Sequence, residues 1–171
     1  MIGRARVLSV AALLALAALP ACGGGSSPAM VDPTAGTIAG TINGTSWTKL
    51  SNAYWAGKMV AGSPPVVIFL FEAPVECSDI VNLNWDKTAT GARQILEFGI
   101  LDVAPRSYQI MTDAFANYLF GFYNPDAYSG TVTISAVTPG VDIVGSFDLN
   151  FLPDTLTGAF DAKYCADGQE P

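Results

Sequence analysis

Apolar and polar residues alternate along much of the chain, most regularly towards its C-terminus. The ranges 131–137, 144–152 and 155–165 place apolar side chains at nearly every second position, with mostly polar residues between them. A period of two is typical of a β-strand that has one face in the core and the other in water. The range 66–71, Val-Val-Ile-Phe-Leu-Phe, is apolar throughout. It predicts a strand that is covered on both faces.

Short apolar runs separated by glycine, proline and threonine continue through the rest of the chain after residue 22, and none has a sustained helical period. The dipeptide Asn43-Gly44 is typical of a type I′ hairpin. About nine or ten short antiparallel strands predict an all-β domain, a two-sheet β-sandwich with a closed barrel as the alternative. Besides those above, strands are predicted at 37–42, 45–50, 52–60, 81–85, 94–101, 108–111 and 115–123.

The motif Gly-x-Phe-Asp occurs twice near the C-terminus, at 145–148 and 158–161. If residues 153–154 form the turn between the two copies, counting outward sets Phe147 opposite Phe160. Both rings then lie on the core side, because a period of two fixes the face of every residue in the hairpin.

The same register sets Asp148 opposite Ala159 and makes Asp161 its diagonal neighbour, at about 7–8 Å between α-carbons. Two carboxyl groups at such a spacing could act as the acid and base of an inverting glycosidase. The simpler interpretation is that both solvate the outer face of a sheet.

The first 21 residues have the layout of a secretory signal peptide. Arg4 and Arg6 precede an apolar run of thirteen residues, 7–19, and small residues follow. As a helix this run would cover about 20 Å, against the roughly 30 Å hydrocarbon core of a bilayer. We therefore predict a signal helix over 1–21 rather than a permanent transmembrane helix.

The tetrapeptide Leu19-Pro20-Ala21-Cys22 resembles the lipidation and cleavage signal of bacterial lipoproteins, although Pro20 is a less usual occupant of its position. The resemblance implies that Cys22 receives a diacylglyceryl group, that the chain is cut after Ala21, and that the new amino group is acylated, for example with palmitate. Because Gly23 rather than Asp follows the cysteine, it also implies sorting to the outer membrane, on either the periplasmic or the surface face. The alternative is an ordinary signal peptide with an incidental cysteine.

Residues 22–35 contain many Gly, Ser and Pro and predict a flexible linker with a reach of roughly 20 Å. The remaining range, 36–171, suits a single β domain. Its Gly-x-Phe-Asp repeat, ending in Asp161-Ala162-Lys163-Tyr164-Cys165, resembles the C-terminal end of small uncharacterised lipoproteins of Gram-negative bacteria. This second resemblance brings no activity with it.

Without the leader, six Lys and Arg stand against fifteen Asp and Glu, a net charge of −9. This charge argues against nucleic acid or an anionic membrane surface as a partner, so the expected membrane contact is the lipid anchor, with a glycan or a protein as candidate ligand. With Cys22 lipidated, we expect Cys77 and Cys165 to form a disulfide in an oxidising compartment. Closing so long a loop would stabilise the fold by roughly 4–5 kcal/mol. Two separate buried thiols are the alternative.

The sequence contains no histidine. Catalytic triads, histidine general bases and histidine-ligated zinc or iron sites are therefore excluded, and no nucleophile elbow, phosphate loop or EF-hand motif occurs. We predict that the protein is not an enzyme and carries no cofactor besides the covalent lipid. Calcium held by Asp113, Asp126 or Asp142 is an alternative that no spacing specifies.

Aromatic residues could form a stacking platform for sugar rings or peptide on one face of a sheet, although the simpler interpretation is that they pack in the core. The sequence thus predicts a membrane-anchored envelope lipoprotein with a ligand-binding or structural role. The alternative is a carbohydrate-binding module or a carboxylate-dependent glycan hydrolase. The leading candidates for ligand contact are Trp47, Tyr54, Trp55 and Tyr128, with Trp85, Tyr118 and Tyr123 as further members.

Overall fold

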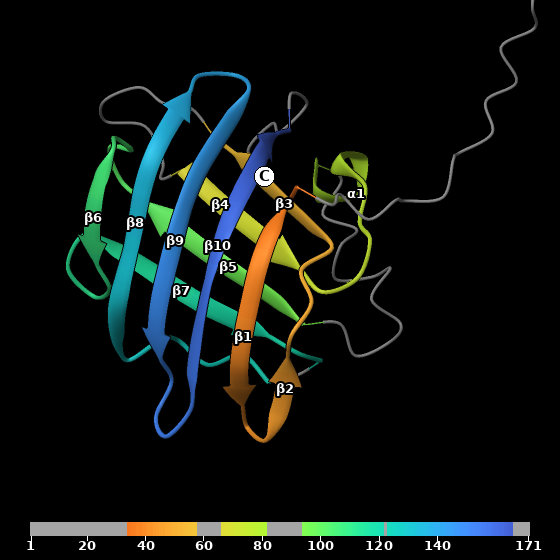
Figure 1. Ribbon diagram of the computed structural model, residues 1–171, viewed down its shortest axis with the longest axis vertical. Helices are drawn as coiled ribbons and strands as arrows, with labels where there is room; N and C mark the ends of the chain where they lie inside the picture. Colours follow the sequence, from red (N-terminus) through yellow and green to blue (C-terminus); the bar gives the residue numbers. More distant parts are fainter. Residues whose placement is uncertain (1–33, 58–65, 82–93, 122, 166–171) are drawn as a thin grey trace, which may run out of the picture.

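The computed structural model describes residues 34–57, 66–81, 94–121 and 123–165. The predicted signal helix, Cys22, most of the linker and Trp85 lie outside these ranges. In the described residues the short apolar runs form ten strands and one short helix (Figure 1). In chain order these are β1 (Gly36–Ile42), β2 (Thr45–Trp47), β3 (Asn52–Ala56), β4 (Val66–Phe71), α1 (Cys77–Val81), β5 (Ile95–Ile100), β6 (Arg106–Gln109), β7 (Ala114–Leu119), β8 (Ser129–Thr138), β9 (Asp142–Asn150) and β10 (Thr155–Tyr164).

The ten strands form one sheet that curls almost into a closed barrel. Its hydrogen-bonded order is β6-β8-β9-β10-β3-β4-β5-β7, and β10 forks, since residues 156–160 pair with β1 and residues 163–164 pair with β3. In Figure 1 the strands β8, β9, β10 and β1 run across the front, and β4, β5 and β7 cross behind them. Every strand pairing is antiparallel except that of β10 with β3. The predicted all-β fold is confirmed, and the sandwich and the barrel are two descriptions of this curled sheet.

The interior between the two layers holds one large cluster of buried side chains, to which all ten strands contribute. Alternate residues of the front strands point into it, as the period of two in 131–137 and 155–165 predicts. Its largest fully buried side chains include Trp47, Tyr108, Tyr118, Phe98 and Phe160.

The hairpin of β9 and β10 has a register that differs from the predicted one by two residues. Phe147 pairs with Gly158, and Phe160 pairs with Gly145. The predicted pairing was wrong because a four-residue loop, 151–154, joins the strands in place of a two-residue turn. A shift of two keeps every side chain on its face. Both rings therefore lie inside as predicted, with 6.5 Å between their centroids.

Each of these two glycines makes room for the ring opposite it. A Cβ added at Gly145 would lie 2.6 Å from Phe160 Cζ, and one added at Gly158 would lie 2.7 Å from Phe147 Cζ. Carbon atoms in van der Waals contact are about 3.5–4.0 Å apart, so any larger residue would displace the ring. The repeat is thus a reciprocal packing device, in which each copy supplies one ring and the space for the other.

Strand β4 is buried on both faces, as its unbroken apolar run predicts. Ile68 and Leu70 face the interior. Phe69 and Phe71 belong to a second, smaller group on the outside of the barrel, which we call the outer cluster. Helix α1 adds Ile80 to this cluster. The sequence pattern indicated a loop and a short strand in this region, and most of the predicted strand, 81–85, lies outside the described residues.

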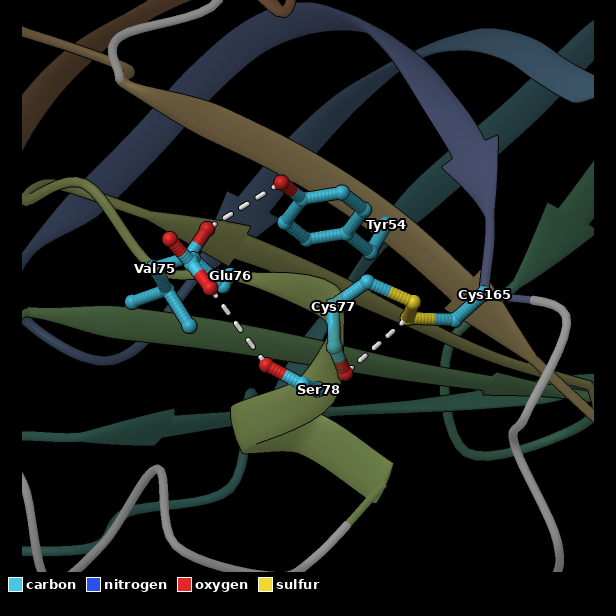
Figure 2. Close-up of a disulfide and its surroundings, with 6 residues drawn as sticks. All are labelled: Tyr54, Val75, Glu76, Cys77, Ser78 and Cys165. Carbon is cyan, nitrogen blue, oxygen red and sulfur yellow. Dashed lines mark hydrogen bonds between the residues drawn. A yellow bond between two sulfur atoms is a disulfide. The ribbon is translucent and has the colours of Figure 1, made fainter. Parts of the chain in front are cut away.

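A disulfide joins Cys77, at the start of α1, to Cys165, directly after β10 (Figure 2). The two Cα atoms are 5.5 Å apart, and Cys165 is fully buried in the outer cluster. The predicted bridge is therefore confirmed. Beside it, the Tyr54 hydroxyl donates to the Val75 carbonyl oxygen at 3.1 Å, which holds the chain before α1 against β3.

Candidate functional site

The four aromatic residues that lead the predicted platform do not share one exposed face. Trp47 is fully buried and Trp55 is 2 % exposed, both in the interior. Tyr54 is half-buried against the outer cluster, whereas Tyr128 is 69 % exposed. Core packing therefore describes the two tryptophans, and Tyr128 is the member of the four that is open to a ligand.

The carboxyl groups of Asp148 and Asp161 are not diagonal neighbours, so that prediction was wrong. Asp148 pairs with Thr157 and Asp161 pairs with Val144. These positions are separated by about 13 Å along the hairpin. Asp161 instead lies 2.8 Å from Lys163 Nζ. The longer loop of the hairpin moved the two carboxyl groups apart.

The three aspartates considered for calcium lie in separate contacts. Asp142 forms an ion pair with Lys163 at 3.6 Å. Asp113 accepts a hydrogen bond from a backbone N–H, and Asp126 accepts one from the side chain of Asn117. In the part of the chain that the structure describes, no three His, Cys, Asp or Glu side chains gather as a metal site requires.

The chain after β7 turns back and pairs along β7 as a further short strand. Tyr118 N donates to Pro125 O at 3.0 Å, and Ala127 N donates to a β7 carbonyl oxygen at 2.8 Å. Between these two bonds, Asn117 lies directly opposite Asp126. The segment 125–127 therefore occupies the edge of β7 that β5 leaves free.

Five side chains on the outer surface of this region form what we call the β7 face. Glu97 of β5 lies opposite Asn117, which lies opposite Asp126, so three polar groups form a row across three neighbouring strands. Phe115 and Tyr128, each two residues from this row, are 41 % and 69 % exposed. Phe115 shares the outer face of β7 with Asn117, because residues two apart in a strand share a face. Tyr128 follows two residues after Asp126, at the bend that leads into β8.

A glycine holds the Phe115 ring on the sheet. Gly99 lies directly opposite on β5, and the ring occupies the position that a Cβ at Gly99 would take. A residue with a side chain at position 99 would force the ring away from the strand. The ring thus rests on backbone while a large part of it remains in contact with solvent.

Glu97 lies between Phe69 of β4 and Asn117 of β7. Burial raises the pKa of the Glu97 carboxyl above its ordinary value, because the charged form loses water beside these neighbours. Asn117 Nδ2 donates to Asp126 Oδ1 at 3.0 Å, which fixes the orientation of the amide. The face therefore offers hydrogen-bond acceptors and an oriented amide beside two aromatic rings, an arrangement suited to binding a ligand.

Sequence reasoning considered Tyr128 and Asp126 separately and missed the other members of the β7 face. One signal was present, because Glu97 is a single charged residue in the otherwise apolar range 95–100. No local pattern indicates that the chain after β7 folds back onto β7, and that return brings Asp126 beside Asn117.

The chain matches no protein-family model, no curated protein and no solved structure. In the ranges that the structure describes, no helix is long and apolar enough to cross a membrane. The case for a function is therefore built from the residues themselves.

Proposed function

We propose that the protein is a lipoprotein of the outer membrane, anchored through lipid on Cys22, whose β domain binds a ligand or serves as a structural part of the envelope. The observation that carries the proposal is the tetrapeptide Leu19-Pro20-Ala21-Cys22, directly after a basic and apolar leader and directly before a linker of Gly and Ser. Three acyl chains exceed the two signals that stable anchoring requires. The domain would stay at the membrane through the lipid alone.

The disulfide between Cys77 and Cys165 supports export of the chain. Disulfides persist in the periplasm and outside the cell, whereas they are rare in the cytosol. The sequence has three cysteines, so the bridge leaves Cys22 as the one unbridged thiol. A thiol directly after the signal peptide is the group that lipidation modifies.

Metabolic labelling tests the anchor. Full-length protein produced in a Gram-negative host with an alkyne analogue of palmitate should carry the label and fractionate with the outer membrane. Cys22→Ser should abolish both results, because the acceptor thiol is gone. A matched control combines Cys22→Ser with Ser26→Cys, which restores the number of cysteines outside the tetrapeptide and should remain unlabelled.

One outcome would contradict the anchor directly. Wild-type protein that is cleaved, unlabelled and released in soluble form would indicate an ordinary signal peptide with an incidental cysteine.

Carbohydrate binding is a second candidate function, and the β7 face favours it. Exposed Phe115 and Tyr128 adjoin carboxyl and amide groups there. A hydrolase built on Asp148 and Asp161 is not favoured, because the two carboxyl groups lie far apart on the β9–β10 hairpin.

A further inference from the structure

We infer that the β7 face, formed by Glu97, Phe115, Asn117, Asp126 and Tyr128, is a binding site for a neutral glycan. This inference rests on the ligand-binding form of the proposed function and names its site and ligand class. It is independent of the lipid anchor, because all five residues belong to the β domain.

The two aromatic rings provide stacking surface. Phe115 lies over Gly99 and is still 41 % exposed, and Tyr128 is 69 % exposed. An aromatic ring has a negatively polarised face, which attracts the positively polarised C–H groups that one side of a sugar ring presents. The Phe115 ring lies directly on the backbone of Gly99, so its exposed part is held at the surface and is available for such contact.

The chain that carries Tyr128 is held in place before any ligand binds. Tyr128 N donates to Asn150 O at 2.8 Å, at the end of β9, and Ala127 is 1 % exposed. Ordering a loop on binding costs free energy, and a site on fixed strands avoids that cost.

The polar row complements the hydroxyl groups of a sugar. Carboxylate oxygens accept hydrogen bonds, and hydroxyl groups donate them. One oxygen of Asp126 accepts from Asn117 Nδ2 at 3.0 Å, and each carboxylate oxygen can accept more than one hydrogen bond. Glu97, on the other side of Asn117, adds a second carboxyl group within the same row.

Charge favours a neutral ligand over an anionic one. Both carboxyl groups on the face are acidic, and the chain after the leader has six basic against fifteen acidic residues. Anionic polymers would be repelled by this field. A peptide that binds by strand addition needs a free strand edge, and segment 125–127 already occupies the edge of β7.

The place where the linker joins the domain leaves the face accessible. Asp161 N donates to Ala35 O at 3.0 Å, so Ala35 lies beside the C-terminal part of β10. Tyr128 lies beside Asn150, which pairs with Thr155 at the other end of β10. The two places are separated by about 20 Å along the strand. A tethered domain can therefore present the β7 face away from its anchor.

Binding to defined polysaccharides tests the inference. Full-length protein in a polyoxyethylene detergent, which contains no sugar, is titrated with soluble mannan, galactan, α-glucan and β-glucan, with heparin as an anionic probe and polylysine as a cationic probe. We expect saturable binding to at least one neutral polysaccharide and none to heparin. Tyr128→Ala and Phe115→Leu should each weaken that binding about three- to tenfold, the usual range for loss of one aromatic contact.

Matched variants separate binding from folding. Phe115→Leu keeps an apolar cover over Gly99 without a π face, so it removes the stacking surface and leaves Gly99 covered. Val141→Ala, at a residue that is 54 % exposed in the turn before β9, should leave binding unchanged.

Three outcomes would overturn the inference: no binding to any of the four neutral polysaccharides, binding that neither Tyr128→Ala nor Phe115→Leu changes, or binding to polylysine alone that these variants weaken. The last would assign the face to a cationic ligand.

Repeating the titration with Cys22→Ser distinguishes failure of the glycan site from failure of the lipid anchor. Binding without acylation would leave the glycan site standing, and acylation without binding would leave the lipoprotein standing.

Discussion

The same contact, a phenylalanine ring over a glycine on the neighbouring strand, occurs in two regions of the barrel. In the interior, Phe147 lies over Gly158 and Phe160 over Gly145, and the two rings are 4 % and 1 % exposed. Phe98, from the opposite layer, lies 5.3 and 5.8 Å from their centroids. On the outside, Phe115 lies over Gly99 and is 41 % exposed.

The difference lies in what covers the free side of the ring. Inside, the second layer packs on it, so the contact contributes to the core. Outside, over Gly99, solvent covers much of the ring, so the same contact positions Phe115 without burying it. A glycine opposite an aromatic residue therefore indicates a ring held in one place. If the opposite layer of the barrel covers that ring, the ring stabilises the core. If no layer covers it, the ring remains available to a ligand.

The largest expected effect comes from the outer cluster. Among the described residues, no second layer of strands covers this cluster, and the disulfide between Cys77 and Cys165 links its parts instead. Replacing both Cys77 and Cys165 with serine should lower the free energy of unfolding by about 4–5 kcal/mol, since a long loop in the unfolded chain is then no longer closed. Urea unfolding followed by tryptophan fluorescence measures the loss, because Trp47 and Trp55 are buried in the interior. Cys22→Ser is the control and should leave the free energy unchanged. A loss below about 1 kcal/mol for the double variant would contradict a stabilising role.

A pair of alanine variants compares the two ring–glycine contacts directly. Phe160→Ala should cost about 3–5 kcal/mol, because it leaves a cavity between the two layers. Phe115→Ala should cost about 1 kcal/mol, because solvent can fill the space. Chemical denaturation of both variants under one condition measures the difference. Equal losses would show that the outer ring is as much a part of the core as the inner one.

The interior could be predicted from the sequence to a large extent, and the reason is visible at Phe147 and Phe160. A period of two fixes the face of each residue, so the sequence predicts both rings inside the barrel, as the structure has them. The predicted pairing of Phe147 with Phe160 was wrong. The partners depend on the loop 151–154. Asp154 in this loop accepts hydrogen bonds from Asn43 N at 2.6 Å and Thr41 Oγ1 at 3.1 Å, on the distant β1–β2 hairpin. A contact so remote in sequence leaves no local pattern.

The β7 face could be predicted much less well. The predicted strand over 94–101 places Glu97 and Gly99 on one face, because residues two apart in a strand share a face, and the structure agrees. Their neighbours Asn117 and Asp126 come together because the chain after β7 folds back along it. The exposure of Tyr128 depends on the same return. Such a site is set by tertiary pairing rather than by the period of any one segment.

The smallest expected effect concerns Glu97, whose carboxyl group lies on the outside of the barrel in partial contact with solvent. Its pKa is raised in the folded protein by burial. The folded state therefore binds the proton more tightly than the unfolded state, and stability falls as the pH rises through the two pKa values. Glu97→Gln removes this titration while keeping the size and the hydrogen-bonding capacity of the side chain.

The Glu97→Gln variant should thus be more stable than the wild type at pH 7, by less than either change above. The gain should disappear as the pH falls below the ordinary carboxyl pKa of 4.5, because both states of the wild type then bind the proton. Thermal unfolding at both pH values measures the gain. Ser146→Ala, at an exposed position on β9 with no titratable group, is the control and should have the same small effect at both pH values. A Glu97→Gln variant that is less stable than the wild type at pH 7 would mean that the carboxylate is stabilised on the β7 face by an interaction that outweighs its loss of water. The β7 face would then differ from the interior in a favourable interaction of a charged group as well as in the exposure of its aromatic ring.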